Sequence, residues 1–138
     1  MQVIIERSSV AMGDDYFAPH ERTYSLNEDA TYMDLLECVK KDYYFPTISG
    51  NNVVWVLANE KYSCICSYFT LTDKGFMGMA EKNLKNICQD SNRLKFKYYS
   101  SPQRWKESIY RMYNNDEYTM WKDGWKEEIE YCNFLLNQ

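Results

Sequence analysis

The sequence predicts an α+β fold that joins a mixed sheet of about five strands, one crossing helix and a C-terminal pair of helices. Three observations support this prediction. Strand-length apolar runs recur before residue 100, one amphipathic helical pattern interrupts them, and from Pro102 onward the pattern is helical. The 138 residues contain no linker long enough to divide the chain, so we expect a single domain over residues 1–138.

The N-terminal elements follow from short-range patterns. Residues 2–7 are predicted to form a strand, and residues 21–26 are predicted to form its partner. Thr31 can cap the helix that follows, and Asp34 approximates a capping box with it. Apolar side chains then recur at the i, i+3, i+4, i+7 spacing of one buried helical stripe, which contains Tyr32, Leu35, Leu36 and Val39.

The middle of the chain changes between strand and helix patterns. Residues 53–58 are continuously apolar, as expected for a central strand covered on both faces. Residues 62–69 alternate, which predicts a half-buried strand. Glycines loosen residues 75–78, and a modest helix is predicted around residues 79–88. Residues 93–99 are predicted to form the last strand.

Two helices are predicted at the C-terminus. Pro102 suits the first helical position after Ser101 as the cap, and the stripe of this helix begins at Trp105. Gly124 lowers helix stability by roughly 1 kcal/mol relative to alanine, so the last helix is expected to bend or begin there. Its buried stripe is predicted to contain Tyr118, Trp121, Trp125, Ile129, Cys132 and Leu136.

The order of the predicted elements resembles the ubiquitin-like β-grasp arrangement. A hairpin, a crossing helix and further strands that return to the same sheet make up this order over residues 1–99. Residues 100–138 would then be a helical extension packed on a face or an edge of the sheet. A ferredoxin-like α+β sandwich is the main competing arrangement.

The charge balance argues against nucleic-acid binding. The net charge is −4 and the isoelectric point is about 5.0, whereas binding to phosphates requires a clustered basic face. The most basic strand, residues 93–99, places Lys95 and Lys97 on one face and apolar side chains on the other. We expect that basic face to be solvated.

The sequence predicts a reduced, cytoplasmic protein. Residues 1–6 lack the basic and long apolar regions of a secretory signal. No apolar run approaches the roughly 20 residues of a membrane span, so no membrane association is expected. The five cysteines form an odd set without the spacing of a disulfide framework.

The connection between the first two predicted strands contains Gly13, Asp14, Asp15 and the only histidine, His20. Two carboxylates and an imidazole can hold a divalent cation or act as acid and base. Metal sites usually need three or four protein ligands, and the sequence has neither a second histidine nor cysteines at zinc-site spacing. We therefore favour a hairpin turn or a protein contact, and we predict no catalytic residue, metal or other cofactor.

Acidic and aromatic side chains gather in two parts of the sequence, which suits a surface that meets a basic protein partner. Charge would steer the encounter, and aromatic rings would anchor it. The candidate contact residues are Asp14, Asp15, Tyr16, Phe17, His20, Asp116, Glu117, Tyr118 and Trp121. The acids within residues 127–130 are expected to form a solvated helix face instead.

The segments Met12-Gly13-Asp14-Asp15, Pro19-His20 and Ile48-Ser49-Gly50 resemble those of small acidic bacterial proteins that give immunity to secreted toxins. The resemblance implies a non-enzymatic, cytosolic protein that binds a basic toxin domain, often a nuclease, and blocks its active site or locks it shut. A phage-encoded inhibitor of a host enzyme that handles nucleic acids would present the same features.

Two other functions fit the sequence. A small enzyme or metal-dependent hydrolase would use Asp14, Asp15 and His20, and it would lose activity but keep its partners when all three become alanine. A structural adaptor of β-grasp type would pair an exposed sheet edge with a strand of its partner. Its binding would survive changes in the first connection and fail when proline blocks an edge strand.

Overall fold

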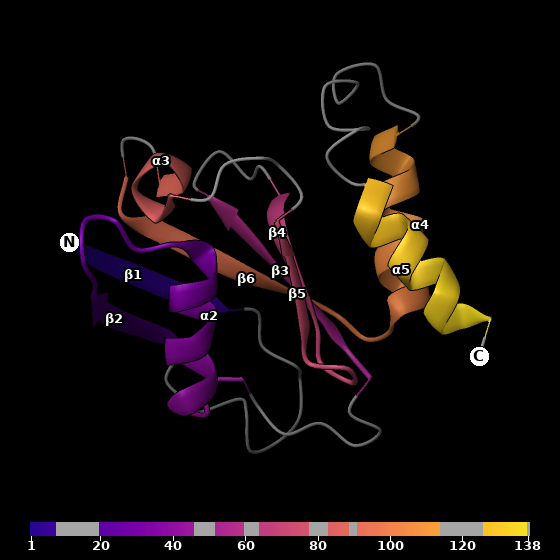
Figure 1. The fold of residues 1–138 in the computed structure, drawn as a ribbon, viewed down its shortest axis with the longest axis horizontal. Coiled ribbons are helices and arrows are strands. Elements are labelled where there is room, and N and C mark those ends of the chain that lie inside the picture. The colour runs from indigo at the N-terminus through magenta and orange to yellow at the C-terminus, as the bar shows by residue number, and fades with distance from the viewer. Residues whose placement is uncertain are drawn as a thin grey trace.

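One mixed sheet runs through the computed structural model, which describes residues 1–7, 20–45, 52–59, 64–77, 83–88, 91–113 and 126–137. Figure 1 shows this curled sheet with helices packed around it, so the α+β class is confirmed. In chain order the elements are β1 (Gln2–Arg7), β2 (Glu21–Ser25), α2 (Tyr32–Lys41), β3 (Val54–Asn59), β4 (Cys64–Phe69), β5 (Lys74–Met77), α3 (Leu84–Cys88), β6 (Arg93–Tyr99), α4 (Pro102–Tyr113) and α5 (Lys126–Leu136).

The strand order across the sheet is β2-β1-β6-β3-β4-β5. β1 pairs antiparallel with β2 and parallel with β6, and the remaining neighbours pair antiparallel. In this register Val3 lies opposite Tyr24, and Leu57 lies opposite Phe96. The described sheet therefore has six strands, whereas the sequence predicts about five.

β5 is the strand that the sequence pattern does not predict. It contains Gly75, and because glycine is depleted in strands the sequence indicates a loosened segment there. The glycine is required by packing, since a Cβ at this position would lie 2.9 Å from Cδ2 of Leu36 on α2. The backbone of β5 therefore approaches α2 more closely than a larger residue would allow.

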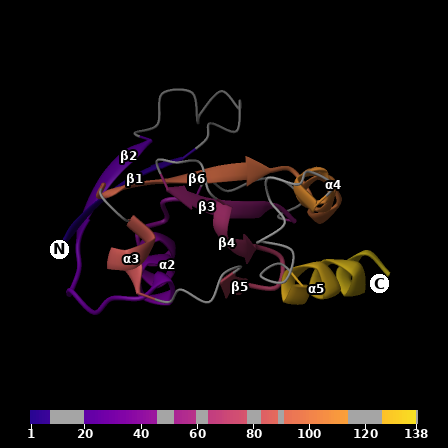
Figure 2. The ribbon, with the colours of Figure 1, turned by 90° about the horizontal axis from the view of Figure 1, so that it is seen from above.

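Side chains of the central strands alternate between two buried clusters on opposite faces of the sheet. The α2-side core lies between the sheet and α2 and α3; it includes Trp55, Leu57 and Phe96. Figure 2 shows α2 and α3 at one end of the molecule and α4 and α5 together at the other. The α5-side core packs with α4 and α5 and contains Val54, Val56, Phe69, Trp105 and Cys132.

The predicted start of α2 is confirmed. Oγ1 of Thr31 accepts a hydrogen bond from the Asp34 amide at 3.3 Å, and Oδ2 of Asp34 accepts one from the Thr31 amide at 2.9 Å. This capping box satisfies amides that the first helical turn leaves without partners. The whole predicted stripe of the helix is buried in the α2-side core: Tyr32, Leu35, Leu36 and Val39.

One prediction for the middle of the chain needs correction. β4 is covered on both faces and not half-buried, because even Ser67 lies at 0% exposure between the buried Cys66 and Tyr68. One face of β4 joins the α2-side core and the other joins the α5-side core. Within the predicted helix around residues 79–88 the structure describes α3, Leu84–Cys88, with Leu84 and Ile87 buried. Residues 79–82 lie outside the described residues.

The predicted start of α4 is also confirmed. The helix begins at Pro102, and Oγ of Ser101 accepts a hydrogen bond from the Arg104 amide at 3.2 Å. Trp105 is fully buried against Phe69, with the two ring centroids 5.2 Å apart. Within the described ranges no helix, α4 included, is long and apolar enough to span a membrane.

The predicted buried face of α5 is confirmed only in part. Cys132 is buried and Ile129 packs against the α5-side core as expected, but Leu136 is 39% exposed, and the end of the helix points away from the sheet (Figure 1). Glu128, predicted to be solvated, is only 1% exposed. Tyr131 and Leu135 are partly buried against the same core. The other predicted stripe residues Tyr118, Trp121 and Trp125 lie outside the described residues.

Candidate functional site

The structure describes one of the predicted contact residues, His20. The others lie outside the described residues: Asp14, Asp15, Tyr16, Phe17, Asp116, Glu117, Tyr118 and Trp121. The acidic, aromatic surface therefore stays a prediction, and so does the hypothesis of a metal site in the first connection. Within the described part of the chain, no group of three or more His, Cys, Asp or Glu side chains is placed to hold a metal ion.

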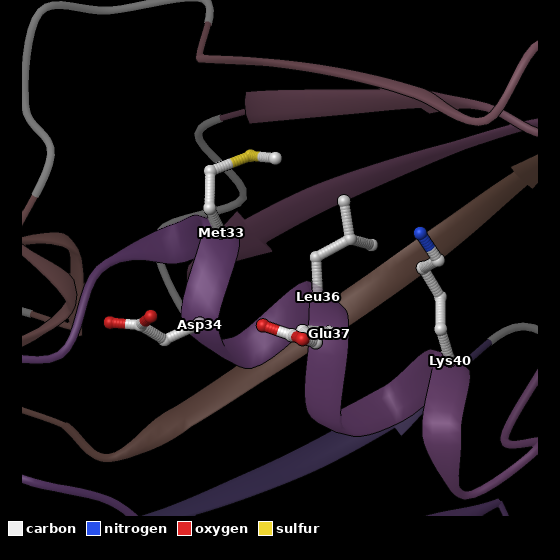
Figure 3. Close-up of a pocket in the computed structure, with 5 residues that line it drawn as sticks. All are labelled: Met33, Asp34, Leu36, Glu37 and Lys40. Atoms are coloured by element: carbon white, nitrogen blue, oxygen red, sulfur yellow. The ribbon is translucent and has the colours of Figure 1, made fainter.

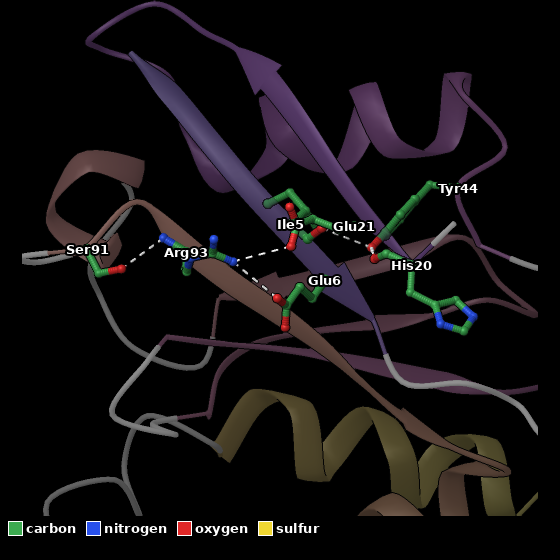
Figure 4. Close-up of polar contacts among 7 residues, drawn as sticks. All are labelled: Ile5, Glu6, His20, Glu21, Tyr44, Ser91 and Arg93. Atoms are coloured by element: carbon green, nitrogen blue, oxygen red, sulfur yellow. Dashed lines mark hydrogen bonds and ion pairs between the residues drawn. The ribbon is translucent and has the colours of Figure 1, made fainter. Parts of the chain in front are cut away.

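His20 lies where the chain enters β2, and Tyr44 holds its backbone in place. The Tyr44 hydroxyl donates to the His20 carbonyl and also lies 3.3 Å from the carbonyl oxygen of Ile5 on β1. Figure 4 shows the imidazole of His20 pointing away from this contact. One tyrosine just beyond α2 therefore ties together the two strands that flank residues 8–19.

Two guanidinium groups flank the ring of Tyr44. The Arg7 group lies 5.6 Å from the ring centroid, and the Arg22 group lies 5.4 Å from it. Nε of Arg7 donates to the Tyr44 carbonyl at 3.0 Å, and Arg22 forms an ion pair with Asp42 at 3.7 Å. Burial raises the pKa of the Tyr44 hydroxyl well above its ordinary value, so the phenol stays protonated and remains a donor. We call Arg7, Arg22, Asp42 and Tyr44 the loop anchor.

A second polar cluster contains Arg93, the first residue of β6, which is the most basic of the predicted strands. Nη1 of Arg93 lies 3.2 Å from Oε1 of Glu6 and 3.4 Å from Oε2 of Glu21 (Figure 4). These ion pairs are exposed, so each contributes little to stability. They do neutralise the charge of Arg93, and Lys95 is exposed as predicted for a solvated face. Neither observation favours a phosphate-binding surface.

A hollow of about 240 Å³ lies beside α2, and we call it the α2 groove. Figure 3 shows the side chains that line it, all from α2: Met33, Asp34, Leu36, Glu37 and Lys40. Gly75 of β5 lies against Leu36 and Met33, so the groove is next to the edge strand of the sheet. Met33 is 46% exposed, which leaves a flexible apolar side chain available for contact.

The rim of the α2 groove is acidic. Lys40 is neutralised, because its Nζ lies 2.6 Å from Oδ1 of Asp73 in the β4–β5 turn. Asp73 also accepts a hydrogen bond from the Tyr68 hydroxyl at 2.6 Å, and these two contacts, with Lys40 first, lower the pKa of its carboxyl. Asp34 and Glu37 remain as two carboxylates that no cation among the described residues pairs with.

An exposed tyrosine follows the groove at the end of α2. Tyr43 is 90% exposed and has a φ of 53°, in the left-handed region that favours glycine. Its amide donates to the Lys40 carbonyl at 3.1 Å, and the Tyr44 amide donates to the Val39 carbonyl at 3.0 Å. These two bonds form a Schellman motif, in which glycine is usual at the position of Tyr43. The fold thus presents a large aromatic ring to solvent at a conformational cost.

The α2 groove and Tyr43 together offer features that can contact a protein partner. An apolar floor with acidic groups around it can receive an apolar side chain that stands next to lysine or arginine. A ring fixed at the end of the same helix adds a stiff anchor of the kind enriched at interfaces. Tyr43 also lies next to the loop anchor, which joins α2 to the entry of β2.

Sequence reasoning missed both the α2 groove and Tyr43. The outward stripe of α2 was available as a signal, since Met33, Glu37 and Lys40 share one helix face. The hollow itself also depends on where β5 lies, and the sequence pattern does not predict β5. Tyr43 carries no local signal, because the left-handed position after a helix favours glycine or asparagine.

Comparisons with protein-family models, curated proteins and solved structures found no match for this chain.

Proposed function

We propose that the chain is a non-enzymatic, cytoplasmic protein-binding module that neutralises a basic partner, such as a toxin or nuclease domain. The observation that carries this proposal is the α2 groove, in which two carboxylates without a cation among the described residues, Asp34 and Glu37, lie beside Met33 and Leu36. An acidic rim steers a basic partner during the encounter, and the apolar floor then receives one of its side chains. Binding at this place would cover or immobilise the partner's active site.

Tyr43 and the loop anchor extend the proposed contact surface. Tyr43 lies two residues beyond the end of α2, and the neighbouring Asp42 and Tyr44 are bonded to Arg22 and to His20. A partner seated on the end of α2 would therefore also lie near Arg7 and His20, the residues that flank the first connection. Its candidate residues Asp14, Asp15, Tyr16 and Phe17 belong to the same proposal.

The proposal includes a β-grasp-like arrangement over residues 1–99, with residues 100–138 as a helical extension of one domain. Three features support it. β1 and β2 form an antiparallel pair, α2 follows them, and β6 returns between β1 and β3 in an orientation parallel to β1. The additional strand β5 extends this arrangement at its edge.

The test begins with capture of a stoichiometric partner from the native cell and isolation of the complex by size exclusion. The affinity of that partner is then measured by calorimetry for the Glu37→Lys variant. We expect it to fall about tenfold at low salt, and less at high salt, because the lost interaction is electrostatic. The control is Glu130→Lys, which makes the same change in net charge at an exposed position on α5.

Equal weakening by the two substitutions would show that only net charge matters, and the groove would then play no part. Unchanged binding by both variants would remove the charge-steered mechanism altogether. A chain that captures no partner, with no toxin gene beside its own, would contradict the proposal as a whole.

An adaptor that pairs through a sheet edge is the second candidate. It is favoured by the position of β5, which is last in the strand order and pairs with β4 alone among the described strands. A partner strand added there would lie next to the α2 groove. In the register of β5 the Met77 amide points away from β4, so Met77→Pro would abolish edge pairing, because proline offers no amide, while Glu37→Lys would leave it largely intact. The opposite result favours the groove.

A further inference from the structure

One carboxyl group is buried where α5 packs against the sheet. Glu128 lies in the first turn of α5 and is 1% exposed. Its Oε2 has no hydrogen-bond partner among the described residues. On β4, Oγ of Ser67 is also fully buried, and it too has no hydrogen-bond partner among the described residues. Polar atoms of this kind are rare in folded proteins, and each calls for an explanation.

Among the described residues, the charged and titratable groups around Glu128 do not compensate an ionised carboxylate. On α5, the neighbouring Glu127 adds repulsion. On β4 and α2, the charge of Glu128 raises the pKa of the Cys66 thiol and the Tyr32 hydroxyl, although burial is the main cause for both. On α4, Lys106 acts on Cys132, one turn further along α5.

The protonated form is therefore the one that fits this site. Burial raises the pKa of Glu128 from 4.5 to about 7, against the opposing effect of a hydrogen bond from its own backbone amide. A neutral carboxyl needs no counter-ion in the packed interface. An ionised one must be solvated, and α5 has to move for water to reach it.

We propose that Glu128 makes the seating of α5 on the sheet depend on pH, with the helix docked when the carboxyl is neutral and loosened when it is ionised. Loosening of α5 would break the contacts that hold it on the sheet. The ring centroids of Tyr131 and Phe69 lie 5.3 Å apart, and the Tyr131 hydroxyl contacts Thr72. Sγ of Cys132 donates to the Pro102 carbonyl at 3.3 Å. Undocking would expose the α5-side core and leave the α2-side core closed.

The sign of the effect follows from the two protonation equilibria. The docked state holds the proton more tightly than the undocked state, so docking is strongest below pH 4.5 and weakens as the pH rises to about 7. Above that range both states are ionised and the effect levels off. Between pH 5.5 and pH 8 the docking equilibrium should weaken about 30-fold, which is the ratio these pKa values imply.

The test is hydrogen exchange measured by mass spectrometry over this pH range, with intrinsic exchange rates corrected for pH. We expect protection of Lys126–Leu136 to fall about 30-fold while that of Val54–Asn59 stays constant. Glu128→Gln should remove the pH dependence. Glu127→Gln, which neutralises the adjacent exposed glutamate, should keep most of it.

Three results would overturn the proposal: a flat profile for the natural sequence, equal profiles for Glu128→Gln and the natural sequence, or loss of protection in β3 together with α5. If Glu128→Gln does not fold, Glu128→Met provides an apolar side chain of similar length, and α5 should then stay docked at every pH. NMR titration of the natural protein supplies an independent check, because a Glu128 carboxyl that titrates near 4.5 contradicts the proposal.

Discussion

The two faces of the sheet treat a buried charge in different ways. On the α2 side, Arg7 is 6% exposed, but its guanidinium donates to the Tyr44 carbonyl and stacks on the Tyr44 ring. On the α5 side, Glu128 is buried with one carboxylate oxygen unpartnered. A hydrogen-bonded charge helps to fix a structure, whereas a buried ionisable group without a partner makes the structure depend on pH. We therefore expect the N-terminal part of the fold to stay closed when α5 opens.

The two cores also differ in size, and the α2-side core is the larger one. The α2-side core joins both helices α2 and α3 to buried residues of β1, β3, β4 and β6, and Phe45 stacks on Trp55 with the ring centroids 4.9 Å apart. The α5-side core is a smaller cluster under two helices at one end of the sheet (Figure 2). We therefore expect the α2-side core to determine global stability and the α5-side core to open first.

The largest expected effect comes from exchanging one tryptophan on each side for alanine. Trp55→Ala should lower the free energy of unfolding by about 3–5 kcal/mol, because it removes a large side chain from the centre of the α2-side core. Trp105→Ala removes the same group from the α5-side core, and it should first expose α4 and α5 to hydrogen exchange. Urea unfolding and exchange of both variants check this. Equal exposure of β3 in the two variants would remove the distinction.

The next effect is the pH dependence of global stability. Glu128 has a higher pKa in the folded chain than in the unfolded one, so the stability it contributes is present below pH 4.5 and is lost as the pH rises through about 7. The free energy of unfolding should fall by about 3 kcal/mol across that window from this group. Urea unfolding at pH 5 and pH 8 measures the difference. In Glu128→Gln the contribution should disappear, and a slope that persists there would assign it to another group.

A smaller effect is expected where β5 meets α2. Gly75→Ala should destabilise the fold by about 2 kcal/mol, because the new methyl group would lie 2.9 Å from Cδ2 of Leu36. Combining it with Leu36→Ala should cost less than the sum of the two single changes, since the second creates room for the first. Thermal unfolding of the three variants gives the coupling. Strict additivity would mean that the two residues do not press on one another.

The smallest effect is a gain. Tyr43→Gly should raise stability by about 0.5–1 kcal/mol, because glycine adopts a φ of 53° without strain. Tyr43→Ala keeps the strained backbone and serves as the control. If the exposed ring is a contact residue, both variants bind the partner more weakly although one of them is more stable. A glycine variant less stable than the alanine variant would show that the ring itself supports the fold.

The sequence predicts those parts of the fold that local chemistry determines. The Thr31–Asp34 capping box, the buried stripe of α2 and the start of α4 at Pro102 each depend on residues within two turns of one another, and all three are confirmed. β5 is different, because its glycine is explained only by Leu36 on another element. Local patterns therefore predict helix ends well and the edge of the sheet poorly.

The face of α5 was predicted only in part, for a related reason. Ile129 and Cys132 pack on the α5-side core as predicted, but Leu136 is 39% exposed. The burial of Glu128 was not predicted, because a glutamate is usually solvated. Only the packing of the helix against the sheet reveals it. Of the predicted contact surface, His20 alone lies within the described residues, so that prediction stays open to the experiments proposed above.

The double contact of the Tyr44 hydroxyl has a consequence for how the protein can vary. The ends of the connection from Arg7 to His20 are held by a residue that does not belong to it. Lengthening such a connection costs only about 0.6 kcal/mol for each doubling of its length. The connection between Arg7 and His20 can therefore be replaced by other sequences of different length, while the rest of the chain keeps its fold.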